Sequence, residues 1–291
     1  MEVVVVDDGS TDGSAELAAS SSVLGRPVRM IPSTGGAVAA RIAGSTAATG
    51  EVLVFTDSDC RPRPRWLSTL VECVDQGADV VHGRTVPARA PRPLERTLWA
   101  GDEGLFASCN IAYRRCTFED LGGFDPTVEG RLGFRMEKRA KGLGFGEDTV
   151  LGWRAQRSGA KVLYAPDAVV EHHVFPPDVA DSISRSWMMA AFPALVRECP
   201  ELRQTLVRNG ILFGPRNRLP VYATAAGLVA RRRLVAAAAA TWWAWTRLSE
   251  LRGRPASWPE RLAALPSEMA IDVVSAAALV VGSVKARTPL V

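Results

Sequence analysis

Two aspartates one residue apart, Asp57 and Asp59, follow the apolar run VLVFT and are the residues best suited to chemistry. If the chain stays extended after Thr56, both carboxylates point to the same side of the backbone. Two hard oxygen donors at one point suit Mg²⁺ or Mn²⁺ carrying a phosphorylated ligand. A lone D-x-D motif is common, however, and is better explained as a helix N-cap with a spare acid. The motif therefore needs support from elsewhere in the chain.

A second acidic pair supplies part of that support. Asp7 and Asp8 end the earlier apolar run Val3–Val6. Ligands of α/β sheets bind beyond the carboxyl ends of strands, so we expect the two acidic strand ends to face one another over a parallel sheet. Crowded carboxylates cost free energy unless a cation or a hydrogen-bond donor compensates them. The arrangement favours one shared ligand site.

Two more segments of the chain carry side chains that could act as a general base or a metal ligand. Glu147 and Asp148 open a predicted helix after the glycine-rich stretch 130–146, which we expect to be a loop. Acids interact favourably with a helix N-terminus, which accounts for Glu147, whereas Asp148 is a candidate general base for an attacking hydroxyl. His172 ends a late strand beside His173, and a neutral imidazole is a third candidate metal ligand. A satisfied polar histidine is the simpler alternative there.

The elements that position these residues alternate between strand-like and helix-like patterns up to residue 176. Such alternation predicts an α/β fold with a largely parallel, twisted sheet flanked by helices. After Pro176 and Pro177 the sequence turns to Ala, Leu, Arg and Trp in helical periods, interrupted by prolines. We therefore expect a catalytic domain over 1–177 and an α-helical C-terminal region over 178–291.

Composition excludes several classes of protein. The 291 residues are 47% hydrophobic with a net charge of +4, which suits a globular chain and does not call for nucleic acid. None of the five cysteines forms a C-x-x-C pair, and their number is odd, so we expect neither disulfides nor a zinc site, and a reducing compartment. We expect no signal peptide and no confident spanning helix, because no apolar stretch is long enough.

Several motifs together resemble those of family-2 glycosyltransferases of GT-A fold. They are VVVVDDGSTDGS, GGAVAARIAGSTAATGEVLVFTDSD, GGFDP, GEDTVLGWRAQRSG and APDAVVEHH, in that order, between residues 2 and 173. The resemblance implies an inverting, hexosyltransferase-type enzyme that moves a sugar from a nucleotide-diphosphate sugar to an acceptor hydroxyl. It also implies a divalent cation, Mn²⁺ or Mg²⁺, and a glycan, lipid-linked or small-molecule acceptor, as in cell-envelope biosynthesis.

The resemblance also assigns roles on the donor side. Asp8 matches the residue that contacts the nucleotide base or ribose, with Asp7 beside it. Arg41 matches the family's arginine in the small-residue helix, although Ile42 stands where the family usually has asparagine. With Asp57 and Glu147, these residues are the candidate substrate-binding set.

On the chemical side, the resemblance implies that Asp57 and Asp59 bind the metal, Asp59 more directly. Asp148 matches the catalytic base, and His172 matches a histidine that completes the metal or diphosphate shell. The family normally has a further strand and helix before the DDGS strand. We therefore expect a mis-set start or a fragment of an active enzyme.

The C-terminal region leaves two alternatives open. Arg231–Arg233 lie beside an apolar run that contains Trp242, Trp243 and Trp245, a pattern typical of a peripheral membrane contact. The same helices are equally explained as ordinary core against the catalytic domain. We expect a cytoplasmic protein, which under the first alternative lies at the inner face of the cell membrane.

Two other classes of protein compete with this interpretation. A receiver-type phosphoacceptor domain also has an acidic pair after its first strand and an aspartate near position 57, but Lys161 begins a strand where that fold needs a lysine at a strand end. A non-catalytic, degenerate relative retained for binding is favoured by Ile42 and opposed by the intact Asp57, Asp59 and Asp148.

Overall fold

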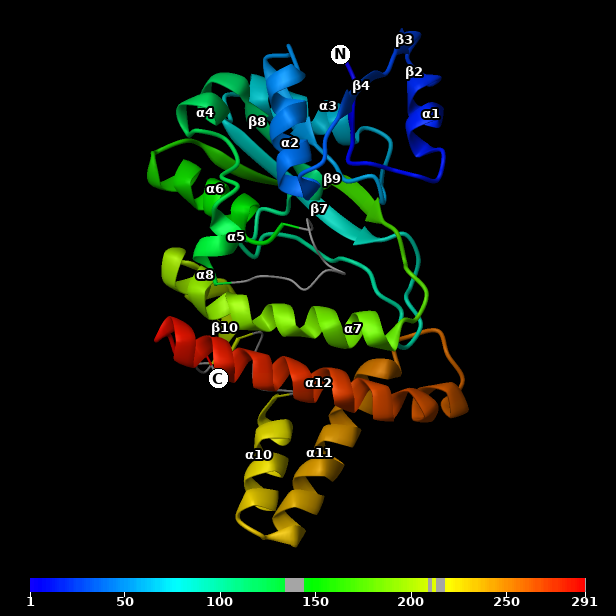
Figure 1. The fold of residues 1–291 in the computed structure, drawn as a ribbon, viewed down its shortest axis with the longest axis vertical. Coiled ribbons are helices and arrows are strands. Elements are labelled where there is room, and N and C mark those ends of the chain that lie inside the picture. The colour runs from blue at the N-terminus through cyan, green and yellow to red at the C-terminus, as the bar shows by residue number, and fades with distance from the viewer. Residues whose placement is uncertain (134–143, 209–210, 213–217, 291) are drawn as a thin grey trace. The chain divides into compact units, whose positions relative to one another are not determined.

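The computed structural model describes residues 1–133, 144–208, 211–212 and 218–290 (Figure 1). Most of the predicted 130–146 loop lies outside these residues, as does Pro215, one of the prolines that interrupt the C-terminal helical pattern. The chain divides into two compact units. The first contains Met1–Val86, Ala100–Arg131 and the later residues up to Glu171, and the second contains Pro87–Trp99 and the chain from His172 onward. The domain boundary near 177 stays a prediction.

The first unit is mixed α/β. Its strands are β1 (Val4–Asp7), β2 (Ser22–Val23), β3 (Arg26–Pro27), β4 (Arg29–Pro32), β5 (Val52–Phe55), β6 (Cys60–Pro62), β7 (Val80–Pro87), β8 (Ile111–Arg114) and β9 (Val162–His172). Its helices are α1 (Ser14–Ala19), α2 (Gly36–Ala47), α3 (Trp66–Asp75), the short 3₁₀ turn η1 (Ser108–Asn110), α4 (Arg115–Asp120), α5 (Val128–Arg131) and α6 (Glu147–Arg157). The α/β class predicted from the sequence is confirmed.

The strands form a five-stranded sheet in the order β5-β8-β7-β9-β6 and a separate parallel pair, β1 with β4. Strand β8 runs antiparallel to both of its neighbours, β5 and β7. The direction of β8 cannot be read from its residues, because its burial on both faces gives the same continuous apolar pattern in either direction. The five-stranded sheet therefore contains antiparallel pairs, and the parallel arrangement expected from the alternation of elements is found for β1 with β4.

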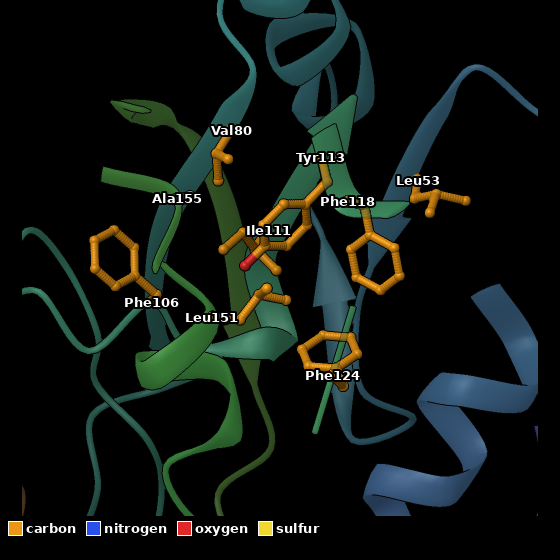
Figure 2. Close-up of a cluster of buried hydrophobic side chains, with 9 residues drawn as sticks. All are labelled: Leu53, Val80, Phe106, Ile111, Tyr113, Phe118, Phe124, Leu151 and Ala155. Atoms are coloured by element: carbon orange, nitrogen blue, oxygen red, sulfur yellow. The ribbon is translucent and has the colours of Figure 1, made fainter. Parts of the chain in front are cut away.

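Side chains from β8 alternate between two layers of core. Ile111 and Tyr113 pack with Leu151 and Ala155 of α6 in one cluster (Figure 2), whereas Ala112 packs with Leu70 of α3 in another. Successive strand residues point to opposite faces, so one strand serves both layers. The first cluster also holds α6 against the sheet, and α6 begins with Glu147 and Asp148.

Gly152 allows α6 to approach its neighbour closely. A Cβ at this position would overlap the ring of Phe106, which is 2% exposed and has a left-handed φ of 52°. We expect Gly152→Ala to lower the free energy of unfolding by about 2 kcal/mol, because an overpacked core must shift backbone or rotamers. Urea unfolding followed by circular dichroism measures this loss.

Gly130→Ala is the matched control, because Gly130 lies in α5 with no atom near the added Cβ. Its effect should stay within about 0.5 kcal/mol. Equal stability of the two variants would show that the contact between Gly152 and Phe106 does not limit the packing of α6.

Helix α2 packs against β1 and against the core cluster that contains Leu53 of β5. A Cβ on Gly44 would lie 3.1 Å from Val6 Cγ2 of β1, so the helix backbone runs close to that strand. Val38 and Ile42 of the same helix pack against the cluster that includes Leu53 of β5. Small residues therefore let one helix contact β1 and β5 although these strands belong to different sheets.

The second unit is almost entirely helical, which confirms the predicted helical C-terminal region. It contains α7 (Val179–Ser186), the 3₁₀ helix η2 (Trp187–Ala191), α8 (Phe192–Glu198), α9 (Leu202–Leu206), the short strands β10 (Val207–Arg208) and β11 (Ile211–Leu212), α10 (Arg218–Val229), α11 (Arg233–Leu251) and α12 (Trp258–Ala286). Gly282 of α12 faces the Ala190 carbonyl of η2 with no room for a Cβ. Within the described residues, α12 alone is long and apolar enough to cross a membrane, a test that core helices of soluble proteins also pass.

A buried ionic network joins α11 to α12. Arg247 of α11 pairs with Asp272, lies 3.7 Å from Glu268 Oε2 of α12, and pairs with Glu250 at 3.0 Å. Trp243 donates its indole N–H to Asp272 Oδ2 at 2.8 Å and is only 3% exposed. The expectation that Trp243 lies at a membrane interface is therefore wrong, because this side chain is a buried hydrogen-bond donor.

Candidate active site

Arg41 joins three elements of the first unit. Its Nη2 lies 3.1 Å from Asp57 Oδ1, in the loop after β5, and its Nη1 lies 2.8 Å from Glu147 Oε1, the first residue of α6. Arg41 itself comes from α2. The side chains of Arg41 and Glu147 are 14% and 4% exposed, so this is a largely buried ion pair. The structure thus brings together three of the predicted site residues.

Asp148 is held by backbone hydrogen bonds beside this ion pair. Its Oδ2 accepts the Ser108 N–H at 3.0 Å, and its Oδ1 accepts the Thr149 N–H at 2.7 Å. Gly146 precedes the helix in a left-handed conformation (φ 83°), which lets the chain turn sharply into α6. Both oxygens of the predicted base are therefore oriented by the backbone.

Burial and charge act in opposite directions on these acids. Burial raises the pKa of Asp148 above its ordinary value, and the charge of Arg41 and the Ser108 and Thr149 N–H groups offset part of this effect. Burial and the neighbouring Asp148 carboxylate raise the pKa of Glu147 to about 8, while Arg41 opposes them. Burial tends to lower the pKa of Arg41, but Asp57, Glu147 and Asp148 raise it. An acid with a raised pKa is a better proton acceptor than an ordinary aspartate.

The backbone between Asp57 and Asp59 differs from the expectation. Ser58 and Asp59 form a turn, and the Cys60 N–H donates to the Asp57 carbonyl at 3.1 Å, so the chain does not stay extended after Thr56. The prediction that an extended backbone directs both carboxylates to the same side is therefore wrong. The turn is favoured because Ser and Asp are common turn residues. Asp57 Oδ1 contacts Arg41, and Asp59 Oδ1 lies 3.7 Å from the thiol of Cys60.

The first acidic pair lies at the end of β1. Asp7 Oδ1 accepts the Ser10 N–H, and hydrogen bonds from Ser10 lower the pKa of Asp7. Asp8 Oδ2 accepts the Gly36 N–H at 2.9 Å, at the start of α2. Since β1 and β5 belong to separate sheets among the described residues, the two acidic strand ends do not share one parallel sheet as expected. Asp8 is instead connected to Arg41 through α2.

His172 belongs to the second unit and is 7% exposed. Its Nδ1 lies 2.8 Å from the His173 carbonyl oxygen and 3.4 Å from the hydroxyl of Thr97. Its role as a metal ligand stays a prediction.

Sequence reasoning missed the contribution of Ser108. Its backbone N–H orients the predicted base, and a backbone contact leaves no signal in residue type. The nearby Asn110 was also missed. Its side-chain amide donates to the carbonyls of Arg84 and Ala168, and its oxygen accepts the Trp66 indole N–H. A buried asparagine in an apolar run is the signal that would have found this second residue.

Comparison with known proteins finds a family that the N-terminal part of the chain resembles. Residues 1–122 match the family described as glycosyl transferase family 2. This range includes β1, α2, Arg41 and the D-x-D motif, and it leaves the receiver-domain alternative without support.

Individual relatives are more distant. The chain is 28% identical over 236 residues to the pre-mycofactocin glycosyltransferase of Mycobacterium tuberculosis, which covers 73% of this chain and 46% of that protein. It is 31% identical over 153 residues to the glucosyl-dolichyl phosphate glucuronosyltransferase of Haloferax volcanii, covering 46% of this chain and 47% of that one. The chain thus spans less than half the length of these curated relatives.

Two solved structures resemble the fold. S. aureus TarS 1-349 in complex with UDP-GlcNAc has a TM-score of 0.49 at 17% identity, covering 99% of this chain and 83% of that one. The mannosyltransferase PcManGT of Pyrobaculum calidifontis, in complex with GDP-Man and Mn²⁺, has a TM-score of 0.47 at 21% identity, covering 98% and 77%.

Proposed function

We propose that the chain transfers a hexose from a nucleotide-diphosphate sugar to an acceptor hydroxyl with inversion at the anomeric carbon. The observation that carries this proposal is the carboxylate of Asp148, held by two backbone N–H groups beside the pair that Arg41 forms with Glu147. The match of residues 1–122 to glycosyl transferase family 2 supports the same reaction class. Asp7, Asp8, Arg41, Asp57 and Glu147 would bind the donor.

A divalent cation fits the residues present. Asp57 and Asp59 offer the hard oxygen donors that Mg²⁺ and Mn²⁺ prefer, and the contact of Asp57 Oδ1 with Arg41 leaves Asp59 as the more direct candidate ligand. When bound, such a cation neutralises charge on the diphosphate of the leaving group. His172 is proposed as a further ligand on the sequence resemblance.

Asp148 would act as the general base. Its carboxylate would take the proton of the acceptor hydroxyl while that oxygen forms a bond to the anomeric carbon and the nucleoside diphosphate departs from the opposite side. Attack from the opposite face inverts the configuration, so no protein nucleophile is needed. The raised pKa of Asp148 suits this role, because a stronger base accepts the proton more readily.

The acceptor is proposed to be a glycan or lipid-linked molecule of the cell envelope, with the protein on the cytoplasmic side and its C-terminal helices in contact with the inner membrane face. Two relatives carry names that include a polyprenol phosphate, the glucuronosyltransferase cited above and an undecaprenyl-phosphate 4-deoxy-4-formamido-L-arabinose transferase of Pectobacterium atrosepticum. The second is 33% identical over 126 residues. A small-molecule acceptor is the other alternative.

One observation favours a second candidate function. Ile42 stands where the family usually has asparagine, and it packs into the core cluster beneath α2, so it offers the donor no polar contact. A non-catalytic protein that still binds a nucleotide sugar would tolerate this change. The experiment below separates the two functions, because binding and turnover are measured on the same sample.

The test is a screen of nucleotide sugars with Mn²⁺, using calorimetry for binding and release of nucleoside diphosphate for turnover. We expect the wild-type chain to bind Mn²⁺ together with one donor, and Asp59→Asn to weaken this binding at least about tenfold, because it removes a charged ligand. Asp12→Asn is the control, since Asp12 is an exposed acid that caps the start of α1. Binding without turnover would select the non-catalytic alternative, and an unchanged Asp59→Asn variant would remove Asp59 from the metal site.

A further inference from the structure

The turn between α10 and α11 exposes an unusual set of side chains. Residues 228–235, here called the hairpin tip, read LVARRRLV and are all exposed to solvent. Leu228 and Val229 are 63% and 86% exposed on one side of the arginines, and Leu234 and Val235 are 88% and 50% exposed on the other. Four large aliphatic side chains thus surround three guanidinium groups in one turn.

The exposure follows from a well-defined turn. Arg231 adopts a left-handed φ of 56°, and the Arg232 N–H donates to the Gly227 carbonyl at 2.8 Å. A Cβ on Gly227 would lie 3.0 Å from the Cα of Ala236, so the two helices are in close contact just above the turn. Figure 1 shows α10 and α11 side by side up to this turn. The backbone therefore holds the aliphatic residues outward.

The hairpin carries no acidic residue that could neutralise the tip. Between 219 and 246 the sequence contains no aspartate or glutamate, and Arg231–Arg233 are the only charged residues. On α11, Trp242 and Trp245 are also exposed, at 45% and 64%. A second copy of the chain is a poor partner for this surface, because its own tip would bring more arginines and no carboxylates.

We propose that the hairpin tip binds the surface of a membrane that contains anionic phospholipids. The arginines would pair with lipid phosphates, and Leu228, Val229, Leu234 and Val235 would enter the boundary between headgroups and acyl chains. Exposed apolar side chains and uncompensated positive charge are both unfavourable in isolation, and this one environment satisfies both.

Geometry limits the depth of the contact. The 12 residues of α10 give a helix of about 18 Å, well short of the roughly 30 Å hydrocarbon core of a bilayer. Helix α10 is therefore too short to cross the bilayer. The inference rests on the proposed membrane contact of the C-terminal helices, but not on glycosyl transfer. It assigns that contact to the hairpin tip, because Trp243 is buried and cannot take part.

The test is co-sedimentation of the 291-residue chain with phosphatidylcholine vesicles, prepared with and without phosphatidylglycerol. One variant carries Arg231→Ser, Arg232→Ser and Arg233→Ser, and a second carries Leu228→Ser, Val229→Ser, Leu234→Ser and Val235→Ser. We expect binding to the anionic vesicles to fall about a hundredfold in the first variant, because each basic residue near an anionic surface contributes separately. We expect at least about a tenfold fall in the second.

The matched control is Leu17→Ser with Leu24→Ser, two residues of the first unit that are 70% and 84% exposed. This control should bind like the wild type, and circular dichroism should show all variants folded. If the wild type and both tip variants bind the vesicles equally, the chain contacts the membrane but the hairpin tip is not the binding site. If the wild type does not bind anionic vesicles, both the membrane contact and the role of the tip are wrong. Both are also wrong if the wild type is a dimer in solution and the tip variants are monomers. Donor binding by every variant should remain unchanged, which separates these outcomes from the fate of the proposed transfer reaction.

Discussion

Asp148→Asn is expected to reduce the rate of sugar transfer about a thousandfold and to leave donor binding largely intact. Asparagine has nearly the same size and can keep one oxygen on the Ser108 or Thr149 N–H. It cannot accept the proton of the acceptor hydroxyl, and a positioned general base contributes on the order of 10²–10⁴ in rate. Single-turnover kinetics with the donor found in the screen, together with calorimetric donor titration, measure the two effects separately.

The pH dependence gives the same prediction a second readout. Asp148 acts as a base only when deprotonated, so the rate falls as the pH drops through its pKa. Burial raises that pKa, partly offset by Arg41, so the acidic limb of the rate profile should lie above the ordinary aspartate value of 3.8. This limb should disappear in Asp148→Asn, because the titrating group is gone.

Asp75→Asn is the control for this variant, since Asp75 is an exposed acid at the end of α3. It should retain the wild-type rate and the wild-type pH profile. Full turnover by Asp148→Asn with an unchanged acidic limb would remove Asp148 from the role of base and leave the first candidate function without its central residue.

The second large effect is expected on stability. Arg41→Met should lower the free energy of unfolding by about 3 kcal/mol, because it leaves the carboxylate of Glu147 buried without its partner. Glu147 Oε2 already has no hydrogen-bond partner among the described residues, so the carboxylate has little else to compensate for the loss of Arg41. Urea unfolding at about pH 9, above the Glu147 pKa of about 8, where the carboxylate is charged, measures the loss.

A double variant tests this explanation. Arg41→Met combined with Glu147→Gln should recover a large part of the lost stability, because the uncompensated charge is removed together with its partner. Arg63→Met is the control. Arg63 pairs with Glu171 at 2.7 Å but is 49% exposed, and such pairs contribute about 1 kcal/mol or less. If Arg41→Met and Arg63→Met lowered the free energy of unfolding equally little, the buried pair of Arg41 with Glu147 would contribute no more to stability than an exposed pair.

Local sequence patterns predicted the strand and the helix that carry the acidic residues. Strand β5 and helix α6 lie where the apolar run and the ED motif placed them, since each element has a clear local signature. The link between Arg41 and Glu147 was not predicted as a contact. It joins residues 106 positions apart, and such pairing depends on how α2 and α6 pack, which no local pattern encodes.

Other features of the site depend on backbone geometry that residue types do not reveal. The turn at Ser58–Asp59 and the N–H of Ser108 are set by hydrogen bonds of the main chain. The direction of β8 was hidden for a similar reason, because a strand buried on both faces has the same apolar pattern in either direction. Trp243 was misassigned because tryptophan suits a membrane interface and a buried hydrogen bond equally.

The ionic network of α11 and α12 has a consequence for how the C-terminal helices can meet lipid. By composition α12 would cross a bilayer, yet Glu268 and Asp272 on this helix both pair with Arg247 on its neighbour. A charged side chain at the centre of a spanning helix costs about 3 kcal/mol, and separation from Arg247 would expose two of them. Insertion of α12 by itself is therefore opposed, and the region where Arg247 of α11 joins α12 should remain outside the hydrocarbon layer.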